Sequence, residues 1–117
     1  MIVGPRTTAP LSSRRAFAAL RASGHRGASG PISVRFLPST DGVPQLAYAV
    51  PRRVGGAVTR NRIRRRLRGA VETVGEELQS GAYLVSAEAA CRTVPFGELV
   101  GALRSSLGAA GALREAQ

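Results

Sequence analysis

Residues 46–78 read LAYAVPRRVGGAVTRNRIRRRLRGAVETVGEEL and contain a change from strand to helix periodicity. Leu46, Tyr48 and Val50 alternate with alanines, which is the pattern of a strand with one buried face. Pro51 ends this strand, because proline has no backbone N–H to continue a ladder. The segment therefore predicts one strand, then a basic turn, then a long helix.

The helix is expected to begin near residues 57–60, after a basic, glycine-containing loop at residues 52–56. Its apolar residues recur every three or four positions and so share one helical face. That face predicts packing against a sheet, which leaves the rest of the helix surface to solvent or to a partner. The apolar stripe consists of Ile63, Leu67, Ala70, Val71, Val74 and Leu78.

Upstream of this segment, we expect a helix at residues 13–23. Ser12 or Ser13 can cap its first turn, and Gly24 is a natural end. Residues 25–30 are rich in glycine and serine and favour a link without regular structure.

A strand is expected at residues 32–36, where Ile32, Val34 and Phe36 alternate with polar residues. A turn at residues 39–42 follows. The simplest pairing is a hairpin between this strand and the strand that ends at Val50.

Downstream of the long helix, residues 82–87 form a short apolar run that predicts a central, buried strand. Residues 89–94 are expected to connect it to a last helix, with Pro95 in the first turn. The buried stripe of this last helix consists of Leu99, Leu103 and Leu107.

The predicted order is α-β-β-α-β-α, which indicates a single α+β domain with a small mixed sheet and helices packed on it. We expect this domain to span residues 11–110. Residues 1–10 are interpreted as a flexible arm and residues 111–117 as a tail.

Charge is the most informative part of the composition. All 17 basic residues are arginine, against 7 acidic residues, which gives a net charge of +10. Residues 1–71 hold 14 of the arginines and a single acid, Asp41. Arginine forks onto phosphate oxygens and stacks on bases, so this distribution favours a polyanionic partner.

Several functional classes receive no support from the sequence. Cys91 is the only cysteine, which excludes an internal disulfide and a cysteine-based zinc site. His25 is the only histidine and lies far from any acid in the sequence, so we expect no catalytic role for it. No segment has the length or apolar character of a membrane span or a signal peptide. We expect a soluble, cytoplasmic protein that binds no metal or cofactor by itself.

The long helix carries six arginines in nine residues, without an acid among them. Arg60, Arg64 and Arg68 form one ridge at i, i+4, i+8, and Arg62, Arg65 and Arg66 spread over the other side. Cations near a helix N-terminus cost about 0.3–1 kcal/mol each, and like charges at i, i+4 add a few tenths. A phosphate backbone would relieve both costs.

Asn61 stands within the same arginine run, although asparagine is a mediocre helix former. Two interpretations stay open for its side chain. It can cap or bond locally, or it can contact a nucleotide edge or a sugar.

This segment closely resembles the signature of the bacterial ribonuclease P protein family. The signature is a basic pair, a glycine-containing loop, then Arg-Asn-Arg and a basic helix, here residues 50–55 followed by residues 57–68. Phe17, Gly24 and Arg26 are similar to the family's first helix and the turn after it. The resemblance implies the ribonuclease P protein-like fold, shared with the second domain of ribosomal protein S5.

The resemblance also implies a function. In this family the RNA subunit holds the active site and, with magnesium ions bound by RNA, removes the 5′ leader of precursor transfer RNA. The protein would be an accessory subunit of this endoribonuclease, with no catalytic or metal-binding residue and no required protein partner. Its expected contacts with the catalytic RNA are Arg52, Arg53, Arg60, Asn61, Arg62, Arg64, Arg65 and Arg68.

The family also holds the single-stranded leader in a cleft between the sheet and the first helix. Phe17 matches an aromatic position of that cleft, and we expect Phe36, on a sheet face beside the first helix, as its partner. Arg14 and Arg35 would add positive charge to this leader-binding site. Stacking of an aromatic ring on a base is worth about 1–3 kcal/mol. Ordinary core packing is the open alternative for both phenylalanines. Pro51 replaces a small polar residue common in the family, so we expect no side-chain hydrogen bond from that position.

Three other functions stay open. A structural or ribosomal RNA-binding protein fits the composition equally well, and only the extended motif and the expected hairpin argue against it. A DNA-binding helix is disfavoured because a strand, not a helix-turn-helix partner, precedes the basic helix. A membrane-surface helix is disfavoured because the apolar stripe holds no bulky aromatic residue.

Overall fold

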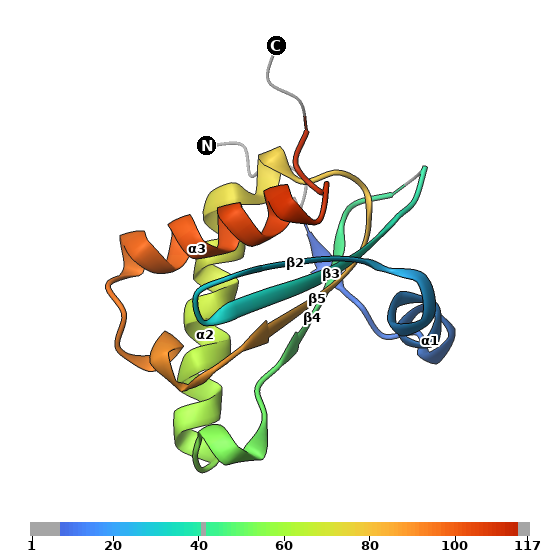
Figure 1. Cartoon of the computed structure of the whole chain (residues 1–117). Helices are drawn as coiled ribbons and strands as arrows, with labels where there is room; N and C mark the ends of the chain where they lie inside the picture. Colours follow the sequence, from blue (N-terminus) through green and yellow to red (C-terminus); the bar gives the residue numbers. More distant parts are fainter. Residues whose placement is uncertain (1–7, 41, 115–117) are drawn as a thin grey trace, which may run out of the picture.

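The computed structural model of this chain describes residues 8–40 and 42–114 (Figure 1). The strands are β1 (Ala9–Pro10), β2 (His25–Ser29), β3 (Ile32–Pro38), β4 (Gln45–Ala49) and β5 (Gly81–Ala87). The helices are α1 (Arg14–Ser23), α2 (Ala57–Val74) and α3 (Phe96–Ala109). Three short 3-10 turns complete the described elements: η1 (Arg52–Val54), η2 (Gly75–Glu77) and η3 (Ala89–Arg92).

The five strands form one mixed sheet in the order β1-β4-β5-β3-β2. The central strand β5 pairs antiparallel with β3 and parallel with β4. This arrangement confirms a single α+β domain with a mixed sheet, and it confirms the central position predicted for residues 82–87.

The predicted hairpin between the strands at residues 32–36 and 46–50 is wrong. β5 lies between β3 and β4, so these two strands do not pair. Alternation identifies a strand and its buried face, but it does not identify the neighbour. Here the most apolar strand comes later in the chain and takes the central place.

The predicted link at residues 25–30 is also wrong, because most of it is β2. This strand pairs antiparallel with β3 from His25↔Phe36 to Ser29↔Ile32, and Gly30, at φ +56°, lies in the turn between the strands. Gly27 is needed within the strand, since a Cβ there would lie 2.1 Å from the Ser106 carbonyl oxygen on α3. The glycine that suggested a link therefore allows close packing.

The folded domain extends beyond residues 11–110 at both ends. β1 pairs parallel with β4, and Ala9 donates a backbone hydrogen bond to Pro44 at 2.9 Å. At the other end, Ala112 is fully buried and its carbonyl accepts from Gln79 at 2.9 Å. Residues 1–7 of the expected arm and residues 115–117 of the expected tail lie outside the described residues.

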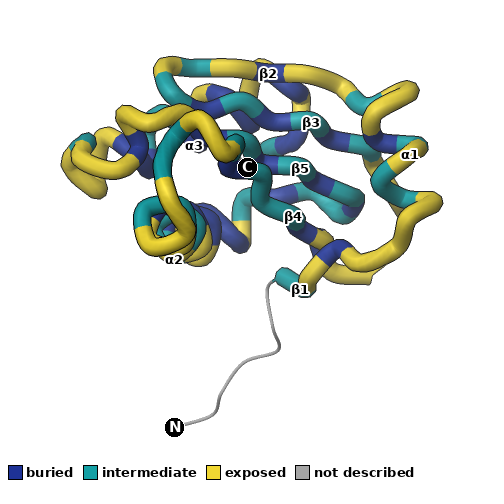
Figure 2. Tube along the Cα trace, turned by 90° about the horizontal axis from the view of Figure 1, so that it is seen from below, coloured by how far each residue is buried: buried dark blue, intermediate teal, exposed yellow. Residues whose placement is uncertain are grey.

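The core lies between one face of the sheet and the helices α2 and α3. All six residues of the predicted stripe and the three leucines of α3 are buried, as predicted. Five of the six lie on α2, but the helix ends at Val74, and Leu78 follows the turn η2 instead of continuing the helix. Along β3 and β5, buried and half-buried residues alternate, so each strand has one covered face (Figure 2). α1 packs against β3 and β5 apart from this core, and Leu20 is its buried residue.

Local signals set the limits of α1 as expected. Ser13 caps the helix, because its Oγ accepts from the Ala16 amide at 3.2 Å. The Gly24 amide closes the last turn on the Leu20 carbonyl at 2.9 Å. These bonds fix where α1 starts and where β2 can begin.

Candidate nucleic-acid interface

Gly55 allows the basic loop at residues 52–56 to pass close to the first turn of α2. Gly55 has φ +156°, near the left-handed limit that favours glycine, and a Cβ there would approach the Thr59 side chain to 3.0 Å. Gly56 is the N-cap residue of α2, and no side chain caps the helix. The first turn holds no acid. The side chains of this first turn therefore provide no negative charge to the free N-terminal amides or to the positive end of the helix dipole.

The ridge of Arg60, Arg64 and Arg68 is positioned by neutral groups. Arg60 donates from Nε to the Gly55 carbonyl at 3.1 Å, and Arg64 donates from Nη1 to Asn61 Oδ1 at 3.0 Å. Asn61 therefore makes the local bond that was one of its two interpretations. These bonds orient the guanidinium groups without neutralising them.

Arg68 lies over the Tyr48 ring of β4, with its guanidinium carbon 5.7 Å from the ring centroid. This distance is within the range of a cation–π contact. Burial raises the pKa of Tyr48 to about 12, although the nearby Arg68 lowers it in part. The phenol is therefore neutral at physiological pH and supports Arg68 without neutralising it.

Arg65 and Arg66 are neighbours in the sequence with different surroundings. Arg66 donates from Nη1 to the Cys91 carbonyl at 2.6 Å and from Nη2 to the Val94 carbonyl. It thereby ties α2 to the segment before α3. Arg62 and Arg65 are exposed, and neither has a side-chain partner among the residues that the structure describes.

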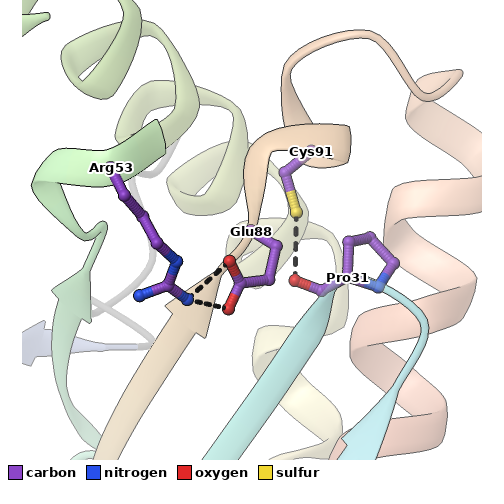
Figure 3. A network of polar contacts seen from close by, with 4 residues as sticks. All are labelled: Pro31, Arg53, Glu88 and Cys91. Atoms are coloured by element: carbon purple, nitrogen blue, oxygen red, sulfur yellow. Dashed lines mark hydrogen bonds and ion pairs between the residues drawn. The ribbon is translucent and has the colours of Figure 1, made fainter. Parts of the chain in front are cut away.

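Arg53 is held at the end of the sheet, beside α2. Its Nη2 lies 2.5 Å from Glu88 Oε2 (Figure 3). Both side chains are more than half exposed. The backbone of Glu88 is anchored in turn, since its amide donates to the Pro31 carbonyl and its carbonyl accepts from Cys91. Arg52 is exposed and has no side-chain partner in the described part of the chain.

No arginine of α2 forms an ion pair with a carboxylate within residues 8–40 and 42–114. The ion pairs found there are Arg53–Glu88 and Arg104–Glu77, and both lie outside α2. The Arg104 guanidinium, hydrogen-bonded to Glu77, lowers the pKa of that carboxyl. The arginines of α2 therefore lack a carboxylate ion-pair partner in this part of the chain, although Glu72, one turn after Arg68 on the same helix, acts on the same Tyr48 ring.

A second basic surface lies on the sheet face that α1 borders. Arg35 of β3 is half-buried and donates from Nη1 to the Arg21 carbonyl in the last turn of α1 at 3.3 Å. Arg26 of β2 is directly opposite Arg35 in the antiparallel register. Like charges at such a pair are destabilising unless an anion lies between them. Arg26 was not among the predicted site residues, because residues 25–30 were interpreted as a link.

Four of the six side chains on the floor of this face are small, the exceptions being Arg35 and Leu84. In register across β3, β5 and β4 lie Arg35, Leu84 and Ala47, and next to them Ser33, Ser86 and Ala49. All six are half-buried. Phe17 and Arg14 belong to α1, where Phe17 is half-buried and Arg14 is exposed.

Phe36 does not belong to this face, which corrects its prediction as a leader-binding residue. Its side chain is 2% exposed, and its ring stacks on Tyr83 with centroids 4.7 Å apart. Because side chains alternate along a strand, Phe36 points to the same side as Val34 and away from Arg35. The alternation along this strand already puts Phe36 on the buried face, so the sequence favours the core-packing interpretation for this ring.

Neither a metal cluster nor a membrane helix is found in the described residues. Within them, no group of three or more His, Cys, Asp or Glu residues could hold a metal ion. Likewise, none of the helices there is both long enough and apolar enough to cross a membrane. Burial raises the pKa of the Cys91 thiol, which disfavours a reactive thiolate.

Comparisons with known proteins agree with one another. The family model for ribonuclease P matches residues 6–111. The ribonuclease P protein component of Symbiobacterium thermophilum is 38% identical over 91 residues, which cover 76% of this chain and 79% of the relative. The Gluconacetobacter diazotrophicus component is 38% identical over 104 residues, which cover 86% and 90%.

Solved structures show the same fold at lower identity. The ribonuclease P protein of Staphylococcus aureus superposes with a TM-score of 0.76 at 19% identity, covering 94% of this chain and all of that chain. The Thermotoga maritima protein gives 0.71 at 21% identity, covering 81% and 91%. From the family match, the sequence relatives and this shared fold, we conclude that the chain belongs to the bacterial ribonuclease P protein family.

Proposed function

We propose that this protein is the ribonuclease P subunit that binds the catalytic RNA and the 5′ leader of precursor transfer RNA, and so promotes removal of the leader. The observation that carries the proposal is the cluster of α2 arginines, none of which is paired with a carboxylate in the described residues. A helix that begins without a capping side chain or a nearby acid, and bears exposed arginines in its first turns, is suited to phosphate. Because the chain belongs to the ribonuclease P protein family, we infer that its polyanionic partner is RNA.

The catalytic RNA would lie on α2 and the loop before it. Arg62, Arg65 and Arg52 offer guanidinium groups without a side-chain partner in the described chain. The remaining contacts would be made by side chains that the protein already orients, which lowers the entropy cost of binding. These are Arg53, Arg60, Asn61, Arg64 and Arg68.

The leader would lie on the small-residue floor between α1 and the sheet. Arg26 and Arg35 lie opposite each other there, and a leader phosphate between them would relieve their repulsion. Arg14 would add positive charge from α1. Phe17 would supply a ring for one base. The alanines and serines of the floor offer no stacking surface, so we expect this protein to hold the leader mainly through its phosphates.

Hydrolysis itself would be carried out by the RNA with its bound Mg²⁺. The protein would raise the local affinity for precursor and neutralise phosphates near the cleavage site, so that less Mg²⁺ is needed. This division of work assigns no proton transfer to any side chain of the protein. Cytoplasmic localisation follows from the same proposal.

Reconstituted cleavage tests the proposal. Ribonuclease P RNA is incubated with 5′-labelled precursor transfer RNA over a range of Mg²⁺ concentrations, with and without the protein. We expect cleavage at Mg²⁺ concentrations at which the RNA alone is inactive. If the protein binds the RNA but leaves its Mg²⁺ requirement unchanged, a structural RNA-binding role replaces the proposed one.

A further inference from the structure

Phe96, the first residue of α3, is a large apolar side chain that the core does not use. It is 44% exposed. Its ring edge lies on α2 over Gly69, where an added Cβ would make ordinary contact at 3.5 Å. One edge of the ring is therefore supported, while much of the side chain remains open to solvent.

The backbone that presents this ring is held firmly. Arg66 binds the Cys91 and Val94 carbonyls just before Pro95. Leu99, one turn into α3, is fully buried, and its amide donates to the Pro95 carbonyl at 3.0 Å. The backbone on both sides of Phe96 is therefore held in place, so binding at this position would order little additional backbone.

Unpaired positive charge lies on the same side of α2. Arg65 is one turn before Gly69 and Arg62 is two turns before it, about 6 Å and about 10 Å along the helix axis. Both arginines are exposed and lack a side-chain partner within the described residues. An exposed aromatic ring beside two such guanidinium groups suits a nucleotide, whose base stacks while its phosphates bind arginine.

We propose that Phe96 stacks on an unpaired base of the RNA bound by α2, with Arg62 and Arg65 on the flanking phosphates. This inference rests on the proposed RNA-binding function and adds a site to it. The site lies on the α3 side of α2, apart from the Arg60–Arg64–Arg68 ridge. A second protein copy is a poorer occupant, because it would bring two arginine clusters together at short range.

The chain contains no tryptophan, so Phe96→Trp introduces a single fluorescent reporter at the site. We expect its emission to be quenched, and its access to acrylamide reduced, when ribonuclease P RNA saturates the protein. Val43→Trp is the matched control, because Val43 is 41% exposed but lies in the β3–β4 loop, away from α2. Its emission should not change. The proposal is overturned if the indole at position 96 is as accessible to acrylamide with saturating RNA as it is without RNA.

Phe96→Leu separates stacking from charge. It keeps an apolar side chain on Gly69 and removes no charge, so the salt dependence of RNA binding should stay the same. We expect binding to weaken by about 5- to 150-fold, the usual range for loss of one stacked base. Unchanged affinity contradicts the stacking contact while leaving the proposed function intact. Absence of RNA binding by the wild-type protein would instead contradict the proposed function.

A third outcome identifies a different occupant. If the indole at position 96 becomes protected with rising protein concentration in the absence of RNA, and RNA adds nothing, the ring is covered by self-association. That result would also overturn the proposal. Circular dichroism of each variant, compared with the wild type, excludes unfolding as the cause of a loss.

Discussion

Arg65 and Arg66 illustrate how adjacent arginines on one helix take different roles. Arg65 is exposed, whereas Arg66 is half-buried and donates to two backbone carbonyls of the segment before α3. The sequence alone could place both on the helix, but it could not predict which one the protein itself would use. That distinction depends on η3, whose position is set by the packing of distant elements.

Substitution of these two residues should therefore affect different properties. Arg66→Ala should lower the free energy of unfolding by about 1–3 kcal/mol, because the Cys91 and Val94 carbonyls lose a charged donor. Arg65→Ala should leave stability within about 0.5 kcal/mol and weaken RNA binding. Urea denaturation checks the first effect and filter binding the second. Equal stability of the two variants would place Arg66 among the solvated arginines.

Tyr48 gives a prediction about pH. Burial raises its pKa in the folded state to about 12, above the ordinary value of 10. The stability that this shift contributes is complete below pH 10 and is lost as pH rises toward 12. Burial raises the pKa of Tyr83, the other tyrosine, as well.

Absorbance at 295 nm checks this prediction, since tyrosinate is the absorbing species and the chain has no tryptophan. Folded protein should show little tyrosinate at pH 10.5, whereas protein in urea should titrate near 10. A transition near pH 10 in the folded protein would mean that the Tyr48 ring is solvated and gives Arg68 no buried support.

At the scale of elements, the helices were more predictable than the sheet. The apolar stripes of α2 and α3 follow from the residues alone, because a helix makes its hydrogen bonds internally and its periodicity reports its buried face. Strand neighbours depend on distant segments. For this reason the insertion of β5 between β3 and β4 could not be predicted from the sequence. β2 was missed because its glycine and serine residues are typical of a link.

The same difference explains the candidate site. The α2 arginines were found from sequence, because local spacing was sufficient to identify them. Arg26 was missed because residues 25–30 were interpreted as a link instead of as β2. Phe36 was misplaced although the alternation along its strand puts it on the face opposite Arg35.

Phe17 and Phe36 can now be separated by experiment. Phe36→Ala should destabilise the fold by about 3–5 kcal/mol, because its ring is buried against Tyr83. Phe17→Ala should leave the protein folded and weaken binding of precursor transfer RNA more than binding of mature transfer RNA. Thermal unfolding and paired binding assays report the two effects. Equal loss of both RNA ligands for Phe17→Ala would remove that ring from the leader site.

At the scale of the whole molecule, the fold gathers charge that the sequence distributes unevenly. The first 71 residues hold 14 arginines and supply α1, four of the five strands and most of α2. The later residues supply the central strand, α3 and six of the seven acids. The later part, with three arginines against six acids, thus forms much of the core, while the basic part provides the two surfaces that we assign to RNA.

The salt dependence of binding tests whether RNA phosphates neutralise α2. Affinity for ribonuclease P RNA is measured against salt concentration for the wild type and for the triple variant Arg62→Gln, Arg64→Gln, Arg65→Gln. A control variant carries Arg21→Gln, Arg92→Gln and Arg104→Gln, which removes equal charge elsewhere. The account predicts that the slope of log K against log salt flattens by about 2–3 units for the α2 variant, and by less than about one unit for the control. Equal slopes for the wild type and the α2 variant would contradict it.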